Sequence, residues 1–116
     1  MFDEATESPL TLEIERSGDA AVVRCRGKLV AGVNDVLYDE VKQLMPDFKR
    51  IVLDLTDLTH LDSMGLGAIV RLYVSARSAG CNLEFVNLGS RVWKVFAASN
   101  LLSVFTIVGE NDIRIH

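Results

Sequence analysis

The change of hydrophobic period between Ile51 and Val70 constrains the fold of this chain more than any other feature. Its first part, IVLDL, is almost continuously aliphatic, as is typical of a strand buried on both faces. A polar turn is predicted next, from Asp57, Thr59 and Asp62. Apolar residues then recur at helical spacing, which predicts a helix from Ser63 to Ala79 with Gly80 as its C-terminal cap. A central strand should therefore lead through a turn into a helix.

The rest of the chain alternates between strand and helix patterns. Residues 10–15 and 21–26 each alternate apolar and polar side chains on either side of a Ser-Gly-Asp turn, which predicts a hairpin. A helix is predicted from Asn34 or Asp35 to Met45, a strand at 83–86, a helix carrying Val92, Val95 and Phe96, and a last strand at 104–108. This order predicts an α/β fold: a mixed β-sheet with an antiparallel N-terminal hairpin, otherwise parallel strands, and three or more helices.

Length and charge limit the classes of function. The 116 residues fit one domain, which we assign to residues 10–116, and the acidic residues 1–9 are predicted to be flexible. A net charge of −4 argues against a nucleic-acid partner, because phosphate backbones are bound by clustered Lys and Arg. No apolar run approaches about 18 residues, so no membrane insertion is expected. Without a secretory signal, the protein is predicted to be cytoplasmic, and Cys25 and Cys81 to be reduced thiols.

Enzymatic interpretations find little support. The Gly65-x-Gly67 pair lacks the remaining residues of a nucleotide-binding motif, and small residues there would let the helix lie close to the sheet. His60 and Ser63 are near in sequence but have no recognisable oxyanion-stabilising group, so His60 is interpreted as a solvated turn residue. Turn formation and capping explain the acidic residues better than metal binding does: Asp54, Asp57 and Asp62. No catalytic, cofactor-binding or metal-binding residue is assigned.

Ser63 has two interpretations from the residues alone. A serine before an apolar helical run is the usual N-cap of the helix. The same position offers unpaired backbone N–H groups and the positive end of the helix dipole, which would favour a phosphate attached to it. A structural cap and a modification site both remain open.

The string LDLTDLTHLDSMGLGAIV resembles the core signature of STAS domains, in which a buried strand leads to DSxGLG at the start of a helix. The likeness extends to Gly27-Lys28-Leu29 and to Val92, Phe96 and residues 99–101. Anti-sigma factor antagonists of this family carry a phosphorylatable serine in that place. The resemblance implies a non-enzymatic, STAS-like fold that binds an anti-sigma factor serine kinase and thereby releases a sigma factor. It also implies that the kinase switches the protein off by phosphorylating Ser63, and that a serine phosphatase reverses this.

A partner-binding surface follows from the same resemblance. It is expected to contain Asp62, Ser63, Met64, Gly65, Leu66, Gly67, Val30 and Trp93. Many family members carry an acidic residue where Val30 stands, so the manner of contact with the kinase, and a STAS domain with another partner, both stay open here. Trp93 falls off the apolar stripe of its helix, so we expect it to be exposed near Met64 and to contact the partner, or else to fold down onto the edge of the sheet.

Two other functions suit the same family. One is a STAS subunit of a lipid-transporting ABC system, although such subunits more often have Thr at the position of Ser63. The other is a nucleotide-sensing STAS module that uses the N-terminus of the helix at Ser63 as an anion site.

Overall fold

The computed structural model describes residues 9–108, with side chains for residues 9–105. Eight elements follow one another: β1 (Leu10–Ser17), β2 (Ala20–Leu29), α1 (Asn34–Leu44), β3 (Arg50–Leu61), α2 (Ser63–Ala79), β4 (Asn82–Val86), α3 (Gly89–Ala98) and β5 (Thr106–Val108). The strands form one sheet in the order β1-β2-β3-β4-β5. Strand β1 pairs with β2 antiparallel, and all other pairs are parallel. The mixed sheet predicted from the sequence is confirmed.

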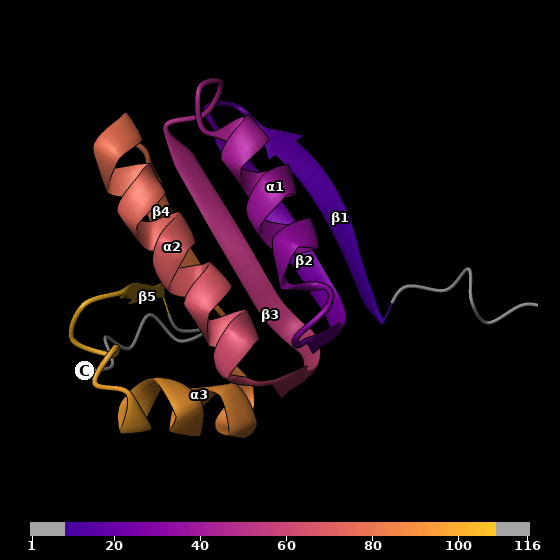
Figure 1. Ribbon diagram of the computed structural model, residues 1–116. Coiled ribbons are helices and arrows are strands. Elements are labelled where there is room, and N and C mark those ends of the chain that lie inside the picture. The colour runs from indigo at the N-terminus through magenta and orange to yellow at the C-terminus, as the bar shows by residue number, and fades with distance from the viewer. Residues whose placement is uncertain (1–8, 109–116) are drawn as a thin grey trace, which may run out of the picture.

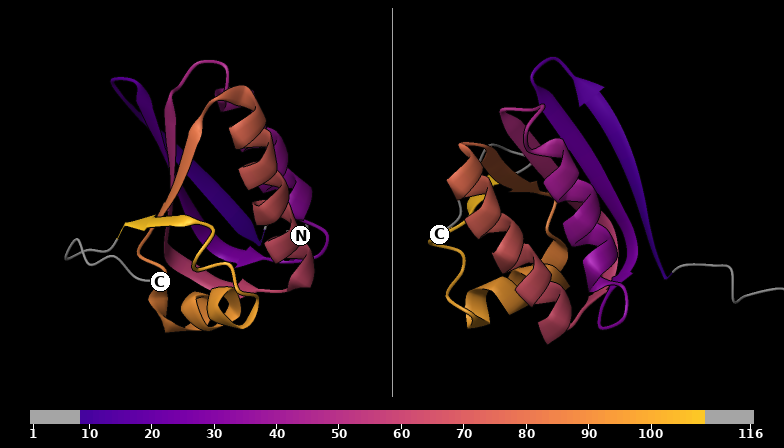
Figure 2. Two further views of the ribbon diagram at one scale, coloured as in Figure 1. Left: turned by 90° about the vertical axis from the view of Figure 1, so that its left-hand side faces the viewer. Right: turned by 45° about the horizontal axis from the view of Figure 1, so that its top comes forward.

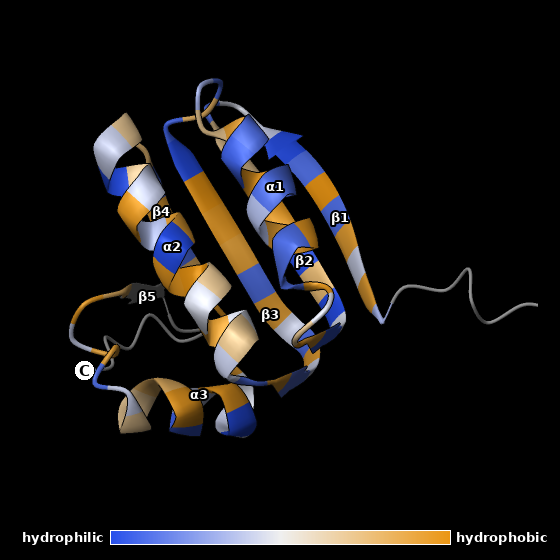
Figure 3. Cartoon of the chain, viewed as in Figure 1, coloured by the Kyte–Doolittle hydropathy of each residue, from blue (hydrophilic) through white to orange (hydrophobic). Residues whose placement is uncertain are grey.

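Helices α1 and α2 lie side by side on one face of the sheet, and α3 lies at the end where β3 finishes (Figures 1 and 2). The buried face of β2 is lined by Ala21, Val23 and Cys25, and that of β3 by Ile51, Leu53 and Leu55. Strand β3 is largely hydrophobic where the helices cover it, whereas the outer side of α1 is hydrophilic (Figure 3). Alternation along strands and helical periodicity along α1 and α2 thus converge on a single layer of apolar side chains.

Strand β3 is longer than the sequence indicates. Residues 57–61, which we predicted as an irregular turn, continue the strand as far as Leu61. Strand β2 also continues past Gly27 to Leu29, and the two strands stay paired to their ends with register shifts on either side of Arg26. Gly27 has φ +106°, and a Cβ there would collide with the carbonyl of Pro9. Residues 57–61 are polar enough to resemble a turn, but pairing with β2 satisfies their backbone hydrogen-bonding groups and keeps them in the strand.

The remaining predicted boundaries differ only slightly. Strand β5 begins at Thr106 rather than at residue 104, because the backbone N–H groups of Val104 and Phe105 both donate to the carbonyl of Leu101 in a tight turn. Strand β4 begins at Asn82, one residue before the predicted start, and Cys81 immediately precedes it. Residues 1–8, which make up nearly all of the predicted flexible N-terminus, lie outside the described residues. Residues 109–116 also lie outside them. No helix in the described part is long and apolar enough to cross a membrane.

The sheet face that α1 and α2 leave uncovered carries ion pairs between neighbouring strands. Arg24 lies 3.5 Å from Asp54 and 3.6 Å from Glu13, while Arg50 donates to both carboxylate oxygens of the buried Glu84 at 2.9 and 3.2 Å. Burial opposes ionisation of Asp54. Hydrogen bonds from Thr56, Asn87 and Arg24 outweigh this effect and lower the pKa of the Asp54 carboxyl. These residues pair with one another across the strands.

Both cysteines are free and buried, at 0% exposure for Cys25 and 6% for Cys81. Burial, with the neighbouring charge of Asp54, raises the pKa of Cys25 to about 12. Burial also raises the pKa of Cys81. Each therefore stays a neutral thiol at physiological pH, as expected for small core residues.

An aromatic cluster anchors α3 and the chain that follows it to the sheet. The ring centroids of Phe85 and Phe96 lie 5.7 Å apart, and that of Phe105 lies 4.8 Å from Phe85 and 5.3 Å from Phe96.

Replacing fully buried Phe96 by Ala should lower the free energy of unfolding by about 3–5 kcal/mol, because the cavity cannot fully collapse. Urea titration followed by circular dichroism measures the change. Val74→Ala, at a site 57% exposed, is the control and should shift stability by less than about 0.5 kcal/mol.

Candidate functional site

The N-terminus of α2 is capped by Asp62, and Ser63 is the first residue inside the helix. Asp62 has extended backbone angles (φ −107°, ψ −175°), and its Oδ1 accepts a hydrogen bond of 2.9 Å from the backbone N–H of Gly65. The predicted start of the helix is confirmed, but the interpretation of Ser63 as its cap is wrong. Aspartate and serine cap helices about equally well, and here the aspartate does so.

Asp62 also holds the loop between β2 and α1. Its Oδ2 accepts a 2.9 Å hydrogen bond from the backbone N–H of Ala31, while its own N–H donates to the carbonyl of Leu29 at 3.4 Å. The hydrogen bond from Ala31, followed by that from Gly65, lowers the pKa of the carboxyl of Asp62. An ionised carboxylate thus joins two segments about thirty residues apart in the chain and places Val30 beside the start of α2.

Gly65 allows α2 to approach the end of β2. It is buried, and a Cβ at this position would collide with the carbonyl of Leu29 and come within 2.9 Å of that residue's side chain. Gly67 has open space around its Cα. The prediction that small residues permit close packing is therefore confirmed for Gly65 and wrong for Gly67, since one helical position faces the sheet and the other does not.

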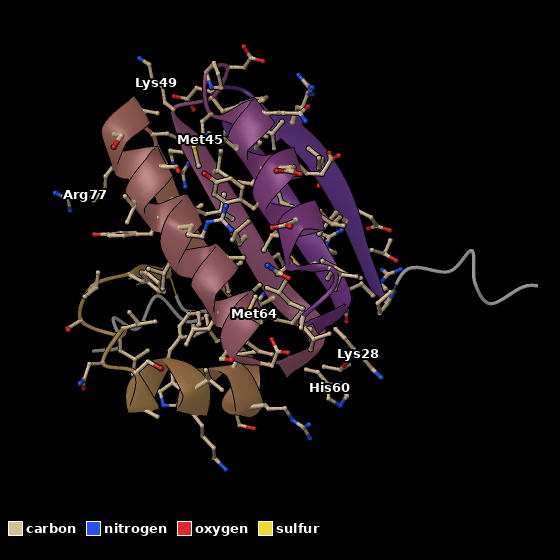
Figure 4. The ribbon with its side chains drawn as sticks, viewed as in Figure 1. Lys28, Met45, Lys49, His60, Met64 and Arg77 are labelled. Carbon is tan, nitrogen blue, oxygen red and sulfur yellow. The ribbon has the colours of Figure 1, made fainter. Side chains whose placement is uncertain are left out.

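The side chains predicted to form the partner-binding surface differ in exposure. Ser63 is exposed, and its hydroxyl makes no hydrogen bond to another described residue. Met64 is 52% exposed and lies at the same end of the molecule as Lys28 and His60 (Figure 4). Val30 and Leu66 are half-buried, and Leu66 packs against the core. Ser63 and Met64 are therefore exposed, while the neighbouring Val30 and Leu66 are partly buried beneath them.

Trp93 is half-buried and packs against the core, so the expectation that it would be exposed is only partly met. Its helix lies across the end of the sheet rather than along a face, so a residue off the main apolar stripe can still contact the core (Figure 1). The sequence pattern did not reveal this, because periodicity identifies one buried stripe and not a second contact at the end of a sheet.

His60 and Asp57, which the sequence placed in a polar turn, make contacts with neighbouring strand residues. His60 is exposed at the end of β3, and its Nδ1 lies 2.9 Å from the hydroxyl oxygen of Thr59. Asp57 lies in β3 rather than in the predicted turn, and its carboxylate is 3.7 Å from the guanidinium of Arg26. Between residues 9 and 108, no group of three or more His, Cys, Asp or Glu side chains is placed to hold a metal ion.

Sequence reasoning missed two contributors, Leu29 and Ala31. Both act mainly through backbone atoms: the carbonyl of Leu29 accepts from Asp62 and, with the Leu29 side chain, limits the space at Gly65, while the N–H of Ala31 donates to Asp62. No side-chain pattern identifies a backbone group with such a role. The closest available signal was the Gly27-Lys28-Leu29 resemblance, which lies next to them in sequence.

Gly65→Ala should lower the free energy of unfolding by about 2 kcal/mol, because the added methyl group forces α2 away from Leu29. Gly67→Ala is the matched control two residues along the same helix. With open space at its site, it should leave stability unchanged or raise it by up to about 1 kcal/mol. Chemical denaturation measures both, and equal destabilisation by the two variants would contradict the packing argument.

Asp62→Ala should lower the denaturation midpoint at pH 7, since Gly65 and Ala31 both lose their acceptor. The folded-state pKa of Asp62 lies below its ordinary value, so the stability that its charge contributes is present above that value. It is lost as the pH falls through the lower folded-state pKa. The difference between wild type and Asp62→Ala should therefore narrow in acid, as measured by urea titrations from pH 7 to pH 3. Asp39→Ala, at an exposed position on α1, should show no such narrowing.

Comparison with known proteins places this geometry in a family. The STAS domain family model matches residues 11–112. A STAS-domain containing protein of Pseudomonas aeruginosa (strain UCBPP-PA14) is 27% identical over 90 residues, which are 78% of this chain and 89% of that protein.

Solved structures share the fold. The anti-sigma factor antagonist SpoIIAA in its unphosphorylated form has a TM-score of 0.72 at 18% identity, over 87% of this chain and 90% of its own. The phosphorylated form of SpoIIAA has a TM-score of 0.68 at 17% identity, over 87% of this chain and 94% of its own. A sulfate transporter family protein from Wolinella succinogenes has a TM-score of 0.69 at 14% identity, over 83% of this chain and 82% of its own. These likenesses show a fold common to regulators and transporter proteins. With the family model matching nearly its whole length, the chain belongs to the STAS domain family.

Proposed function

We propose that this STAS protein is an anti-sigma factor antagonist that binds an anti-sigma factor serine kinase and so releases a sigma factor. Phosphorylation of Ser63 by that kinase switches it off, and a serine phosphatase restores it. The observation that carries the proposal is the division of roles at the start of α2: Asp62 caps the helix, and the exposed hydroxyl of Ser63 is left without a structural hydrogen bond among the described residues. A serine needed as a cap would be unsuited to modification, and this one is not needed.

The position suits a reversible phosphate. A phosphoryl group adds about 1.5 to 2 negative charges at neutral pH, and the N-terminal end of a helix stabilises an anion through its dipole and free N–H groups. Ser63 is the first residue of a seventeen-residue helix whose first turn holds no acidic side chain. The modified protein should therefore remain folded while the electrostatic character of its surface changes.

The same charge would disfavour a tight contact. A partner that covers Ser63 must strip water from the phosphate, and the ionised carboxylate of Asp62 adds a like charge next to it. A loss of about 1.4 kcal/mol already weakens binding tenfold. In this scheme the protein turns over no substrate and acts in the cytoplasm, where its kinase has ATP.

The relation to SpoIIAA supports a regulatory role, and the relation to a sulfate transporter family protein supports a transporter-associated one. A lipid-transporting ABC system is the partner in the second case. A nucleotide-sensing role would instead use the N-terminus of α2 as an anion site. The exposed serine hydroxyl favours the kinase-regulated function, because neither rival requires a phosphoacceptor there.

The decisive experiment compares tagged wild type, Ser63→Ala and Ser63→Asp in pull-downs from the native cytosol with mass spectrometry. We expect Ser63→Ala to retain an ATP-binding serine kinase that Ser63→Asp loses by at least about tenfold, because the aspartate introduces the repulsion. The purified kinase with ATP should then phosphorylate wild type at Ser63 and leave Ser63→Ala unmodified.

Ser78 provides the control, since it is exposed near the opposite end of the same helix. Ser78→Asp should bind the kinase as wild type does. If all three Ser63 forms retrieve the same transporter ATPase, the antagonist assignment is withdrawn. Saturable binding of ATP or GTP to the isolated protein, abolished by Ser63→Asp, would favour the nucleotide sensor.

A further inference from the structure

Most cationic side chains in the described part of the protein are already engaged. Four arginines form ion pairs: Arg24, Arg26, Arg50 and Arg71. Three others lie over aromatic rings: Arg16, Lys42 and Arg77. The cations with neither a carboxylate nor a ring partner among residues 9–105 are Lys28, Lys49, Arg91 and Lys94. These four are free to attract a negative partner.

Three of the four free cations lie at the Ser63 end of the molecule. Lys28 pairs with His60 at the end of the molecule that also carries Met64, whereas Lys49 lies at the opposite end (Figure 4). Arg91 and Lys94 are exposed residues of α3, which crosses the same end as Met64 (Figures 1 and 4). They flank half-buried Trp93 in sequence.

Within residues 9–105, the carboxylates near this end already have partners. Asp62 accepts from two backbone N–H groups, Asp57 pairs with Arg26 at 3.7 Å, and Asp35 pairs with Arg71 at 3.7 Å. Neither α2 nor α3 contains an acidic residue. A chain with a net charge of −4 thus presents free positive charge locally, at the end that carries its proposed phosphoacceptor.

Apolar surface accompanies the cations. Met64 is 52% exposed, and Val36 in the first turn of α1 is 42% exposed. Such a mixture is typical of protein interfaces, in which apolar and aromatic side chains lie inside a polar rim. A nucleic-acid backbone or an anionic membrane fits less well, because both demand a denser array of basic residues than these three.

We propose that Lys28, Arg91 and Lys94 form a basic rim that docks an acidic surface of the partner protein, with Met64 and Trp93 at its apolar centre. This inference rests on the proposed function in that both concern the same end of the molecule. It gives the switch its sign: a phosphate on Ser63 would stand inside the contact, repel the partner's carboxylates and offset the attraction of the rim.

The test uses two synthetic amphipathic peptides that are identical except for Glu or Lys at every polar position. Titrated into ¹⁵N-labelled protein, the Glu peptide should shift the amide signals of Lys28, Met64 and the Arg91–Lys94 segment. Its affinity should fall about tenfold in the double variant Arg91→Glu/Lys94→Glu, and also fall with rising salt. Lys49→Glu, a free cation at the far end, is the matched control and should leave the affinity unchanged.

Several results would overturn the proposal: equal binding of the Lys peptide, no binding of either peptide, or an equal loss in Lys49→Glu. Stronger binding of a DNA duplex or of phosphatidylglycerol vesicles would assign the rim to nucleic acid or lipid instead. The peptides require neither kinase nor ATP, so their binding can succeed where the proposed function fails. Conversely, a kinase captured equally well by Arg91→Glu/Lys94→Glu would reject the basic rim and leave the proposed function intact.

Discussion

The two hydrogen bonds accepted by the carboxylate of Asp62 are the interaction on which the candidate site depends. One closes the first turn of α2 through Gly65, and the other fixes the loop after β2 through Ala31. A single charged group therefore sets both the start of the helix and the position of the adjoining loop. Because this group satisfies the helix terminus, the neighbouring serine hydroxyl is left exposed. The availability of Ser63 is a consequence of its neighbour's structural role.

Packing beneath Asp62 makes this geometry possible. Strands β2 and β3 remain paired as far as Leu29 and Leu61, which brings the start of α2 directly over the end of β2. Only a residue without a side chain fits at Gly65, where Leu29 occupies the space. Hydrophobic burial of β3 on one side and backbone pairing on the other thus support the exposed side chain of Ser63 from below.

Charge is distributed unevenly over this fold, and the distribution has two physical roles. On the uncovered sheet face, Arg24, Arg50, Asp54 and Glu84 pair across strands, so that the polar residues of a half-buried face satisfy one another. At the Ser63 end, the carboxylates of residues 9–105 bind backbone amides or arginines, and three basic side chains of that range have no such partner. A charge that is already paired contributes to the fold, whereas an unpaired one is available to a partner. The proposed switch requires that difference, because adding a phosphate matters most where the surrounding charge is uncompensated.

The period of the hydrophobic residues and the local turn chemistry were enough to predict the order of the elements, the mixed sheet and the start of α2 at Ser63. The motif at residues 53–70 also indicated the STAS family, whose model matches residues 11–112. The features that depend on contacts between distant parts of the backbone became apparent only in the tertiary structure. It extended β3 through residues that look like a turn, because β2 supplied hydrogen-bond partners. It assigned the cap to Asp62 rather than Ser63, separated the roles of Gly65 and Gly67, and half-buried Trp93. Local sequence encodes periodicity and propensity, but which of two equivalent residues makes a contact is fixed only when the chain brings its partner into place.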